Sequence, residues 1–450
     1  MLILSSSFKV IPYKLLHNWI PTNYVELDEI KSFYSMELLE NHIEEESSVI
    51  SPNSLKNSND IRLGGVDRKG YHISENTIAN RKAMLKKVKV NSIIYNPFRI
   101  NQGSIGIRRA EHLPKYVTGA YGVFSCKETL LPEYLILVLK SKPYISQISY
   151  MMSNNARPRL NFNALQALHV PVPNINIQKQ IIASFNSKMN KIDKLRALID
   201  DSKNKIENLI LEFLDLDSSD FTGHQEAFSV IKYRDLRIWS VPQLRKIMNA
   251  ENIFYTKKFP LVKLSELVEC NPSFRYSPST IEVPYVPLKS IEGETGEISY
   301  EHTISWKQSR NYVKFREGDL LLPKISPSLE NNKITMAQQM DHEVALGSRD
   351  LYVLRVISDE TVIPIYLLYL FRSQQFRNII QLFYHGSTGG YKRLSKELLL
   401  NIKIPLPSIK VQLELLDKLT KIQKRIKELL LEIKKIYRIA VNEFDRELYT

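Results

Sequence analysis

The chain has 450 residues, with 62 Lys and Arg against 48 Asp and Glu, a net charge of +14 and 43% apolar residues. This length can supply the cores of two or three domains, and the basic balance suggests an anionic partner. The two cysteines, Cys126 and Cys270, form no CxxC pair, which excludes a cysteine-based zinc module and fits a reducing compartment. No window approaches the roughly 18 apolar residues of a membrane span and the start lacks signal-peptide features, so we expect a soluble cytoplasmic protein with no membrane partner.

The sequence contains two diverged copies of one unit, which the recurrence of similar blocks in the same order indicates. The matching blocks are residues 8–19 with 228–239, residues 25–30 with 262–267, and residues 127–141 with 359–373. The copies therefore extend over about residues 8–214 and 228–450, with a polar, acidic connector between them.

The front part of each copy mixes short strands with turns. In the first copy, residues 44–60 predict a solvated loop, and residues 87–96 alternate like a single strand. In the second copy, residues 282–288 and 316–325 predict strands with turns. The expected fold class is therefore α+β.

The second part of each copy has the same order of elements. A helix of about a dozen residues is expected to begin at Pro132 and at Pro364, because proline suits the first helical turn. A basic loop follows, at residues 154–161 in the first copy and 386–395 in the second. A short helix and a strand that ends in Pro-x-Pro then lead into a long helix.

Residues 178–213 and 412–444 predict two long helices, entered through Gln178 and Gln412. Apolar residues recur in alternating steps of three and four, with polar Arg196 and Lys203 in two slots and no Gly or Pro, which is typical of a coiled-coil seam. At ~1.5 Å per residue, the first helix would be about 55 Å long. A helix with one apolar seam needs a partner, so we expect the two to pack as an antiparallel coiled coil. The seam residues are Ile182, Phe185, Met189, Ile192, Ile199, Ile206, Ile210 and Phe213, then Leu416, Leu419, Ile426, Leu430, Ile433, Ala440 and Phe444.

No complete catalytic motif occurs in the sequence. Residues 95–99 (YNPFR) approach the Asn-Pro-Pro-aromatic loop of amino-methyltransferases but lack the second proline. Glu317 and Asp319 lie beside a strand without the Glu-x-Lys of a nuclease core. A P-loop and metal-type histidine spacings are missing from the sequence. We expect a non-catalytic chain with no metal or cofactor of its own, although acid–base pairs distant in sequence would escape such a search.

Basic clusters are better candidates for function. Similar basic loops in both copies suit contact with phosphates, although incidental charge on solvated loops explains them about as well. The candidate DNA-binding residues are Arg99, Arg108, Arg109, Arg157, Arg159, Lys324, Arg349, Lys392 and Arg393.

The chain resembles the specificity (S) subunit of type I restriction–modification systems over nearly its whole length. The resemblance is carried by YLILVLKS…RPRLNFNALQALHVPVPNINIQKQIIASF and by YLLYLFRS…YKRLSKELLLNIKIPLPSIKVQLELL. It implies two target recognition domains, each reading one half of a split sequence in double-stranded DNA. It also implies that the long helices act as a ruler and dock two methyltransferase subunits. Restriction subunits would complete the complex, with S-adenosylmethionine and ATP with Mg bound by partner subunits, in a bacterial or archaeal cytoplasm.

The resemblance implies a domain order of recognition domain, helix, connector, recognition domain and helix. The expected bounds are residues 1–173, 174–214, 215–227, 228–407 and 408–450. Three alternatives stay open: the specificity subunit of a type IIB-like system, a coiled-coil scaffold that does not bind DNA, and a standalone nuclease or methyltransferase.

Overall fold

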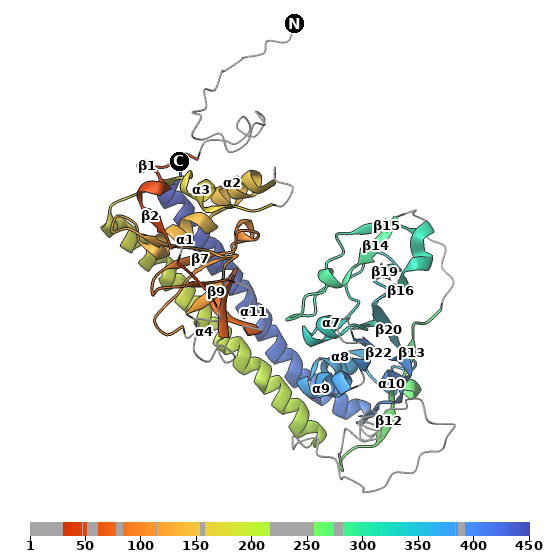
Figure 1. The fold of residues 1–450 in the computed structure, drawn as a ribbon. Coiled ribbons are helices and arrows are strands. Elements are labelled where there is room, and N and C mark those ends of the chain that lie inside the picture. The colour runs from red at the N-terminus through yellow and green to blue at the C-terminus, as the bar shows by residue number, and fades with distance from the viewer. Residues whose placement is uncertain are drawn as a thin grey trace. The chain divides into compact units, whose positions relative to one another are not determined.

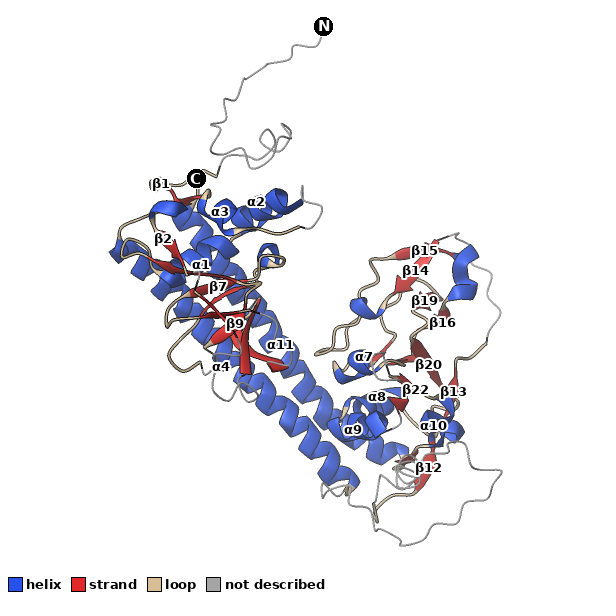
Figure 2. Ribbon diagram, in the orientation of Figure 1, coloured by secondary structure: helices blue, strands red, loops and turns tan. Residues whose placement is uncertain are grey.

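The structure is a computed structural model of the chain. It describes residues 30–46, 48–51, 62–77, 84–112, 115–153, 158–216, 256–273, 282–382, 384–385 and 392–450. The chain divides into two compact units, unit 1 from Met1–Lys194 with Glu432–Thr450, and unit 2 from Leu195–Leu431 (Figure 1). Both units mix helices with strands, which confirms the mixed α and β class (Figure 2). The matching blocks at residues 8–19 and 228–239 lie outside the described residues, as does most of residues 25–30.

Unit 1 is built on a four-stranded antiparallel sheet in the order β2-β10-β7-β8. A three-stranded sheet β3-β6-β9, the hairpin β4-β5 and the pair β1-β11 complete its strands in the described part of the chain. Its strands and helices are β1 (Met36–Leu38), β2 (Ile43–Glu45), β3 (Val49–Ile50), β4 (Arg62–Asp67), β5 (Gly70–Thr77), β6 (Leu85–Lys87), β7 (Ile93–Tyr95), β8 (Ile105–Ile107), β9 (Tyr116–Thr118), β10 (Gly122–Cys126), α1 (Pro132–Lys140), α2 (Lys142–Ser153), α3 (Phe162–Gln166), β11 (His169–Pro171), and parts of α4 (Ile175–Leu214) and α11 (Ile409–Leu448).

Unit 2 contains an antiparallel sheet of the same kind, in the order β13-β20-β17-β18, and a second sheet in the order β15-β14-β19-β16. Its strands and helices are β12 (Leu261–Lys263), α6 (Leu264–Leu267), β13 (Val268–Cys270), β14 (Glu282–Val286), β15 (Thr303–Ser305), β16 (Val313–Phe315), β17 (Leu320–Pro323), α7 (Ser326–Glu330), β18 (Thr335–Met336), β19 (Ala345–Gly347), β20 (Leu351–Val356), α8 (Pro364–Arg372), α9 (Gln374–Leu382), β21 (Tyr384–His385), β22 (Arg393–Leu394), α10 (Lys396–Asn401), β23 (Lys403–Pro405), and the remaining parts of α4 and α11.

Two expectations for the first copy are wrong. The loop expected at residues 44–60 contains the end of β2 and all of β3, because these residues complete sheets whose other strands lie far along the chain. The strand expected at residues 87–96 is two strands, β6 and β7, separated by a turn. Asn91 in that turn has a φ of 66°, the left-handed conformation that asparagine tolerates better than most residues.

The helices that begin at Pro132 and Pro364 are confirmed, but each has nine residues rather than about a dozen. Ser141 and Ser373 end them in extended backbone, and each serine hydroxyl donates to a carbonyl of the last turn, at 2.7 and 2.6 Å. A second helix, α2 or α9, which the sequence did not predict, lies between each of these helices and the predicted basic loop.

The Pro-x-Pro segments and the glutamines after them make the same hydrogen bonds in both units. The fully buried Gln178 side chain accepts from Leu131 N at 2.8 Å and donates to Pro173 O at 2.8 Å and to Thr129 O at 3.0 Å. Gln412 makes the equivalent set, as its side chain accepts from Ile363 N and donates to Pro407 O and Thr361 O. Each glutamine therefore fixes the start of a long helix against the segment that precedes α1 or α8.

The long helices α4 and α11 have 40 residues each and begin three residues before the predicted starts. In unit 1, Phe185 of α4 contacts Phe444 of α11 with ring centroids 6.2 Å apart, and Lys188 forms an ion pair with Glu443. In unit 2, Ile210 and Leu419 belong to one buried core, together with residues of α8 and α9. Within the described residues, none of the helices combines the length and apolar character that crossing a bilayer requires.

Candidate nucleic-acid interface

Four of the predicted basic residues come together in unit 2. Lys324 follows β17, Arg349 lies in the turn between β19 and β20, and Lys392 and Arg393 lie at β22. Backbone hydrogen bonds join these three segments, from Lys324 N to Asp350 O at 2.7 Å, from Leu394 N to Lys324 O at 2.8 Å, and from Ser326 N to Lys392 O at 3.1 Å. We name Lys324, Arg349, Lys392 and Arg393 the basic cluster of unit 2.

The side chains of this cluster differ in how firmly they are held. The Lys324 ammonium donates to Arg349 O at 2.6 Å and lies 4.8 Å from the centroid of the Tyr352 ring. Burial lowers the pKa of this ammonium, although the nearby Cys270 and Asp350 oppose the shift in part. Arg393 is 65% exposed and forms an ion pair with Asp350 at 3.1 Å, while Lys392 is exposed. Lys324 is therefore anchored within the protein, whereas Lys392 and Arg393 are exposed.

Arg349 is exposed but fixed in position. Its Nη2 donates to Asn311 Oδ1 at 2.7 Å, and its Nε donates to Asn311 O. Two hydrogen bonds to one residue define the plane of the guanidinium without cancelling its charge.

In unit 1, two of the predicted basic residues, Arg99 and Arg159, lie on segments equivalent to those of the basic cluster of unit 2. Arg99 lies in the turn that follows β7, and Arg159 precedes Leu160, whose N donates to Pro97 O at 2.9 Å. This hydrogen bond corresponds to the one between Leu394 and Lys324 in unit 2. Both arginines are exposed. Arg157, the remaining member of this predicted loop, lies outside the described residues.

Arg108 and Arg109 lie elsewhere in unit 1 and are engaged within the protein. Arg108 is 5% exposed, and its Nη2 donates to His112 O at 3.2 Å. Arg109 forms an ion pair with Glu133 and donates through Nη1 to Asn91 Oδ1 at 3.0 Å. Their guanidinium groups support the local structure, so they are weaker candidates for DNA contact than the exposed arginines.

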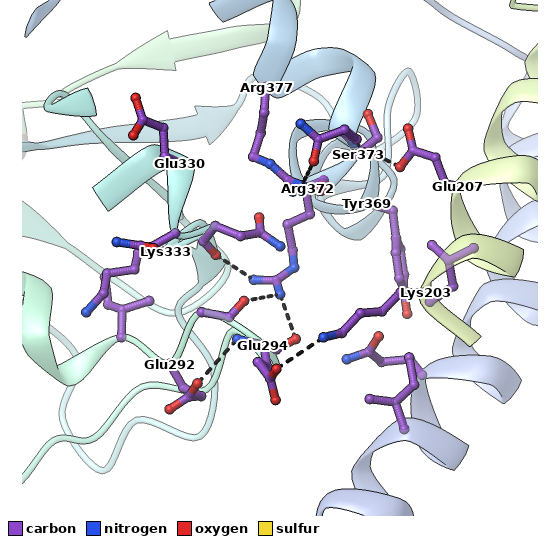
Figure 3. Close-up of a pocket in the computed structure, with 18 of the residues that line it drawn as sticks. Lys203, Glu207, Glu292, Glu294, Glu330, Lys333, Tyr369, Arg372, Ser373 and Arg377 are labelled. Carbon is purple, nitrogen blue, oxygen red and sulfur yellow. Dashed lines mark hydrogen bonds and ion pairs between the residues drawn. The ribbon is translucent and has the colours of Figure 1, made fainter. Parts of the chain in front are cut away.

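A cavity of about 800 Å³ in unit 2 was not expected from the sequence (Figure 3). It is lined by residues of α4, α8, α9 and α11 and by the segment around residues 289–294. The buried Arg372 guanidinium donates to four backbone carbonyls around it, those of Asn332, Ile334, Gly293 and Glu294, at 2.6–3.2 Å. Burial lowers the pKa of Arg372 to about 10.

Other charged groups of this cavity also bind the protein itself. Glu207 of α4 accepts from the first backbone N–H groups of α9, at Gln374 and Gln375. Lys203 forms an ion pair with Glu294 at 3.1 Å. The cavity therefore lies between the helix segments of unit 2 and the segments around residues 289–294 and 330–333, and its polar side chains bind the protein itself. Figure 3 shows these side chains converging on it.

The acidic residues considered for catalysis have a structural role. Asp319 is 1% exposed and accepts two hydrogen bonds from Arg355, at 2.7 and 2.6 Å. Glu317 Oε1 accepts from Gln339 N at 3.0 Å. Among the residues that the structure describes, no group of three or more His, Cys, Asp or Glu is arranged to hold a metal ion.

A family model described as the type I restriction modification DNA specificity domain matches residues 258–435, which include the whole basic cluster of unit 2. This part of the chain therefore resembles a type I DNA specificity domain. The chain is 28% identical over 147 residues to the type I restriction enzyme EcoEI specificity subunit of Escherichia coli, covering 32% of this chain and 24% of the relative. It is 29% identical over 161 residues to the EcoAI specificity subunit of the same organism, covering 35% and 27%.

The matches span about a quarter of the length of these curated relatives. A solved structure of the type I restriction–modification S subunit from M. genitalium is also similar, with 12% identity and a TM-score of 0.44, over 95% of this chain and 99% of that one. The assignment of the specificity domain rests on the sequence matches.

Proposed function

We propose that the chain is the DNA specificity subunit of a type I restriction–modification complex and carries out no catalysis itself. The observation that carries this proposal is the basic cluster of unit 2, which lies inside the specificity domain. Lysines and arginines brought together on exposed loops provide the contacts to phosphates that give most DNA-binding affinity. The type IIB-like and scaffold alternatives are not favoured.

We further propose that residues 1–173 and 228–407 are two target recognition domains, each reading one half of a split sequence. The equivalent hydrogen bonds of Gln178 and Gln412, and the matching strand orders, support a duplicated unit. The helices at residues 174–214 and 408–450 would pack as an antiparallel coiled coil that sets the spacing between half-sites, with residues 215–227 as connector. Contacts between α4 and α11 within each unit support this arrangement.

The long helices would dock two methyltransferase subunits, and restriction subunits would join this assembly in the cytoplasm. Exposed large apolar residues support a docking role, because a solvated helix face normally carries few of them. On the two helices these residues are Leu198, Leu413, Leu431, Tyr437 and Ile439. S-adenosylmethionine and ATP with Mg would be bound by the partner subunits.

Charge reversal of the exposed cations tests DNA binding. The variant carries Arg159→Glu, Lys392→Glu and Arg393→Glu, and its control carries Glu at Lys179, Lys263 and Lys410, which are exposed elsewhere. We expect the variant, assembled with its methyltransferase subunits, to bind DNA at least about tenfold more weakly at about 150 mM salt, with a shallower dependence of log K on log salt. The measurement is a salt titration of binding to labelled duplexes. Unchanged binding would favour a scaffold.

Mapping of methylated adenines in host DNA, with and without the gene, tests the whole proposal. Loss of methylation at one split motif is the expected result. Sequence-independent binding by the assembled complex, or nuclease or methyltransferase activity of the purified chain alone, would contradict the proposal.

A further inference from the structure

Arg349 differs from the other exposed cations of the basic cluster in being held by two hydrogen bonds to neutral oxygens. Two hydrogen bonds to Asn311 fix its guanidinium, and Nη1 has no partner among the residues that the structure describes. An arginine fixed in this way loses little side-chain entropy on binding, whereas a free side chain must be ordered at that moment. The side chain is therefore prepared to make a directed contact.

The backbone that carries Arg349 is also fixed. The Lys324 ammonium donates to Arg349 O at 2.6 Å, and Lys324 N donates to Asp350 O at 2.7 Å. Because Lys324 packs against Tyr352 on β20, the turn is tied to the central sheet of unit 2. Support from a second layer of residues is what holds a recognition side chain within the narrow tolerance that base reading requires.

The charge of Arg349 is not neutralised by its partner. Asn311 supplies an amide oxygen and a carbonyl oxygen, both neutral. Arg109, in contrast, is paired with the Glu133 carboxylate, and Arg393 with the Asp350 carboxylate. Arg349 is thus exposed, its charge is not paired with a carboxylate, and its guanidinium N–H donors are fixed in direction.

We propose that Arg349 is a specificity-determining residue that donates to the O6 and N7 atoms of a guanine in the major groove, and that Lys392 and Arg393 contact phosphates. This inference rests on the proposed function. It assigns base recognition and phosphate contact to different residues of the basic cluster. A guanidinium fork matches the two acceptors of guanine, and this pairing is the commonest specific contact between proteins and bases. The exposed side chains of Lys392 and Arg393 suit contact with the phosphate backbone, which is independent of sequence.

The test is Arg349→Lys, which keeps the charge and removes the fork. The complex assembled with its methyltransferase subunits is used to select duplexes from a library randomised over the half-site, and bound sequences are counted. We expect the preference for guanine at one position to fall about 5- to 150-fold, while the other positions and the slope of log K against log salt stay unchanged. Asn311→Ala, which removes one of the two hydrogen bonds and keeps Arg349, should lower the same preference by a smaller factor.

Lys392→Ala is the matched control. It should weaken binding to all sequences alike and reduce the magnitude of the salt slope by about one. The inference is overturned if Arg349→Lys leaves every base preference intact, or if Arg349→Ala behaves as the Lys392→Ala control does. A wild-type complex with no preferred sequence would instead overturn the proposed function, and this inference with it.

Discussion

Asp445 is a partly buried carboxyl near the end of α11, in unit 1. Its Oδ1 atom is buried and has no hydrogen-bond partner among the described residues. Burial raises the pKa of this carboxyl, and the charge of Lys142 opposes the rise only in part. Because the folded-state pKa lies above the unfolded-state value, the folded state favours the protonated form.

We expect Asp445→Asn to stabilise unit 1 at pH 7. In the wild-type protein, the raised pKa of Asp445 contributes to the free energy of unfolding. This contribution is complete below the pKa of the unfolded state, near pH 4, and it is lost as the pH rises through the pKa of the folded state. The thermal midpoint of the variant should therefore exceed that of wild type at pH 7, and the difference should shrink as pH falls towards 4. Thermal denaturation over a pH series measures this, with Glu447→Gln, exposed on the same helix, as control. A difference that is constant with pH would contradict the argument.

At the residue level, the sequence shows which residues carry the chemistry of a candidate site. It does not show which residues form hydrogen bonds or ion pairs with them. Arg109 and Arg349 were both predicted as DNA-binding residues, but Glu133 and Asn311, which hold them, lie 24 and 38 residues away in sequence. Such pairing depends on which strands become neighbours, and a single sequence does not show this. The fixed guanidinium of Arg349 and the buried one of Arg372 therefore became visible only in three dimensions.

At the level of elements, Gln412 joins the start of α11 to the segment before α8. Its side chain satisfies Ile363 N, Thr361 O and Pro407 O; the hydrogen bond to Pro407 O is buried and the other two are partly buried. Gln412→Met preserves length and removes all three hydrogen bonds, so the buried backbone groups lose their partners. Each buried group left unsatisfied costs ~1–3 kcal/mol.

We expect Gln412→Met to lower the free energy of unfolding by about 2–5 kcal/mol, because one of the three unsatisfied groups is buried and the other two are only partly buried. Gln338→Met, the same chemical change at an exposed position of unit 2, should change it by under about 0.5 kcal/mol. Chemical denaturation of both variants measures the two values. Equal losses in the two variants would mean that the hydrogen bonds of Gln412 contribute little.

The elements that the sequence predicted correctly are those with local signals. Proline at the first turn located α1 and α8, and the apolar period located α4 and α11. The prediction of the apolar seam residues on these two helices was less accurate. Leu195, Leu214 and Leu429 are more deeply buried than several residues that were assigned to the seam. Strands β2 and β3 were missed because their partners, β10 and β6, lie at least 35 residues away and polar side chains mask the pattern.

At the scale of the whole molecule, unit 1 is assembled from two stretches that are distant in sequence. Phe444 and Leu448 of α11 belong to the same buried core as Tyr95 and Phe124 of the central sheet. Phe444 is 6% exposed and lies edge-on to Phe185. The stability of unit 1 therefore depends on side chains more than 200 residues beyond the rest of it.

We expect Phe444→Ala to destabilise unit 1 by about 3–5 kcal/mol, the usual loss for a buried phenylalanine. Hydrogen exchange should show the effect as weaker protection of β7 and β10, with β17 and β20 of unit 2 unchanged. Leu431→Ala, on the same helix at a residue that is 65% exposed, is the control and should leave both sets protected. Loss of protection confined to unit 2 would contradict the division of α11 between the units.

This division has a consequence for protein synthesis. Unit 2 is a single continuous stretch, Leu195–Leu431, so its core can close on the ribosome as soon as that stretch has emerged. The sheet of unit 1 is made earlier, but it lacks Phe444 and Leu448 until after unit 2 has been translated. During this interval the nascent chain exposes apolar strands that chaperones recognise. The unit that is translated first is thus the one that folds last.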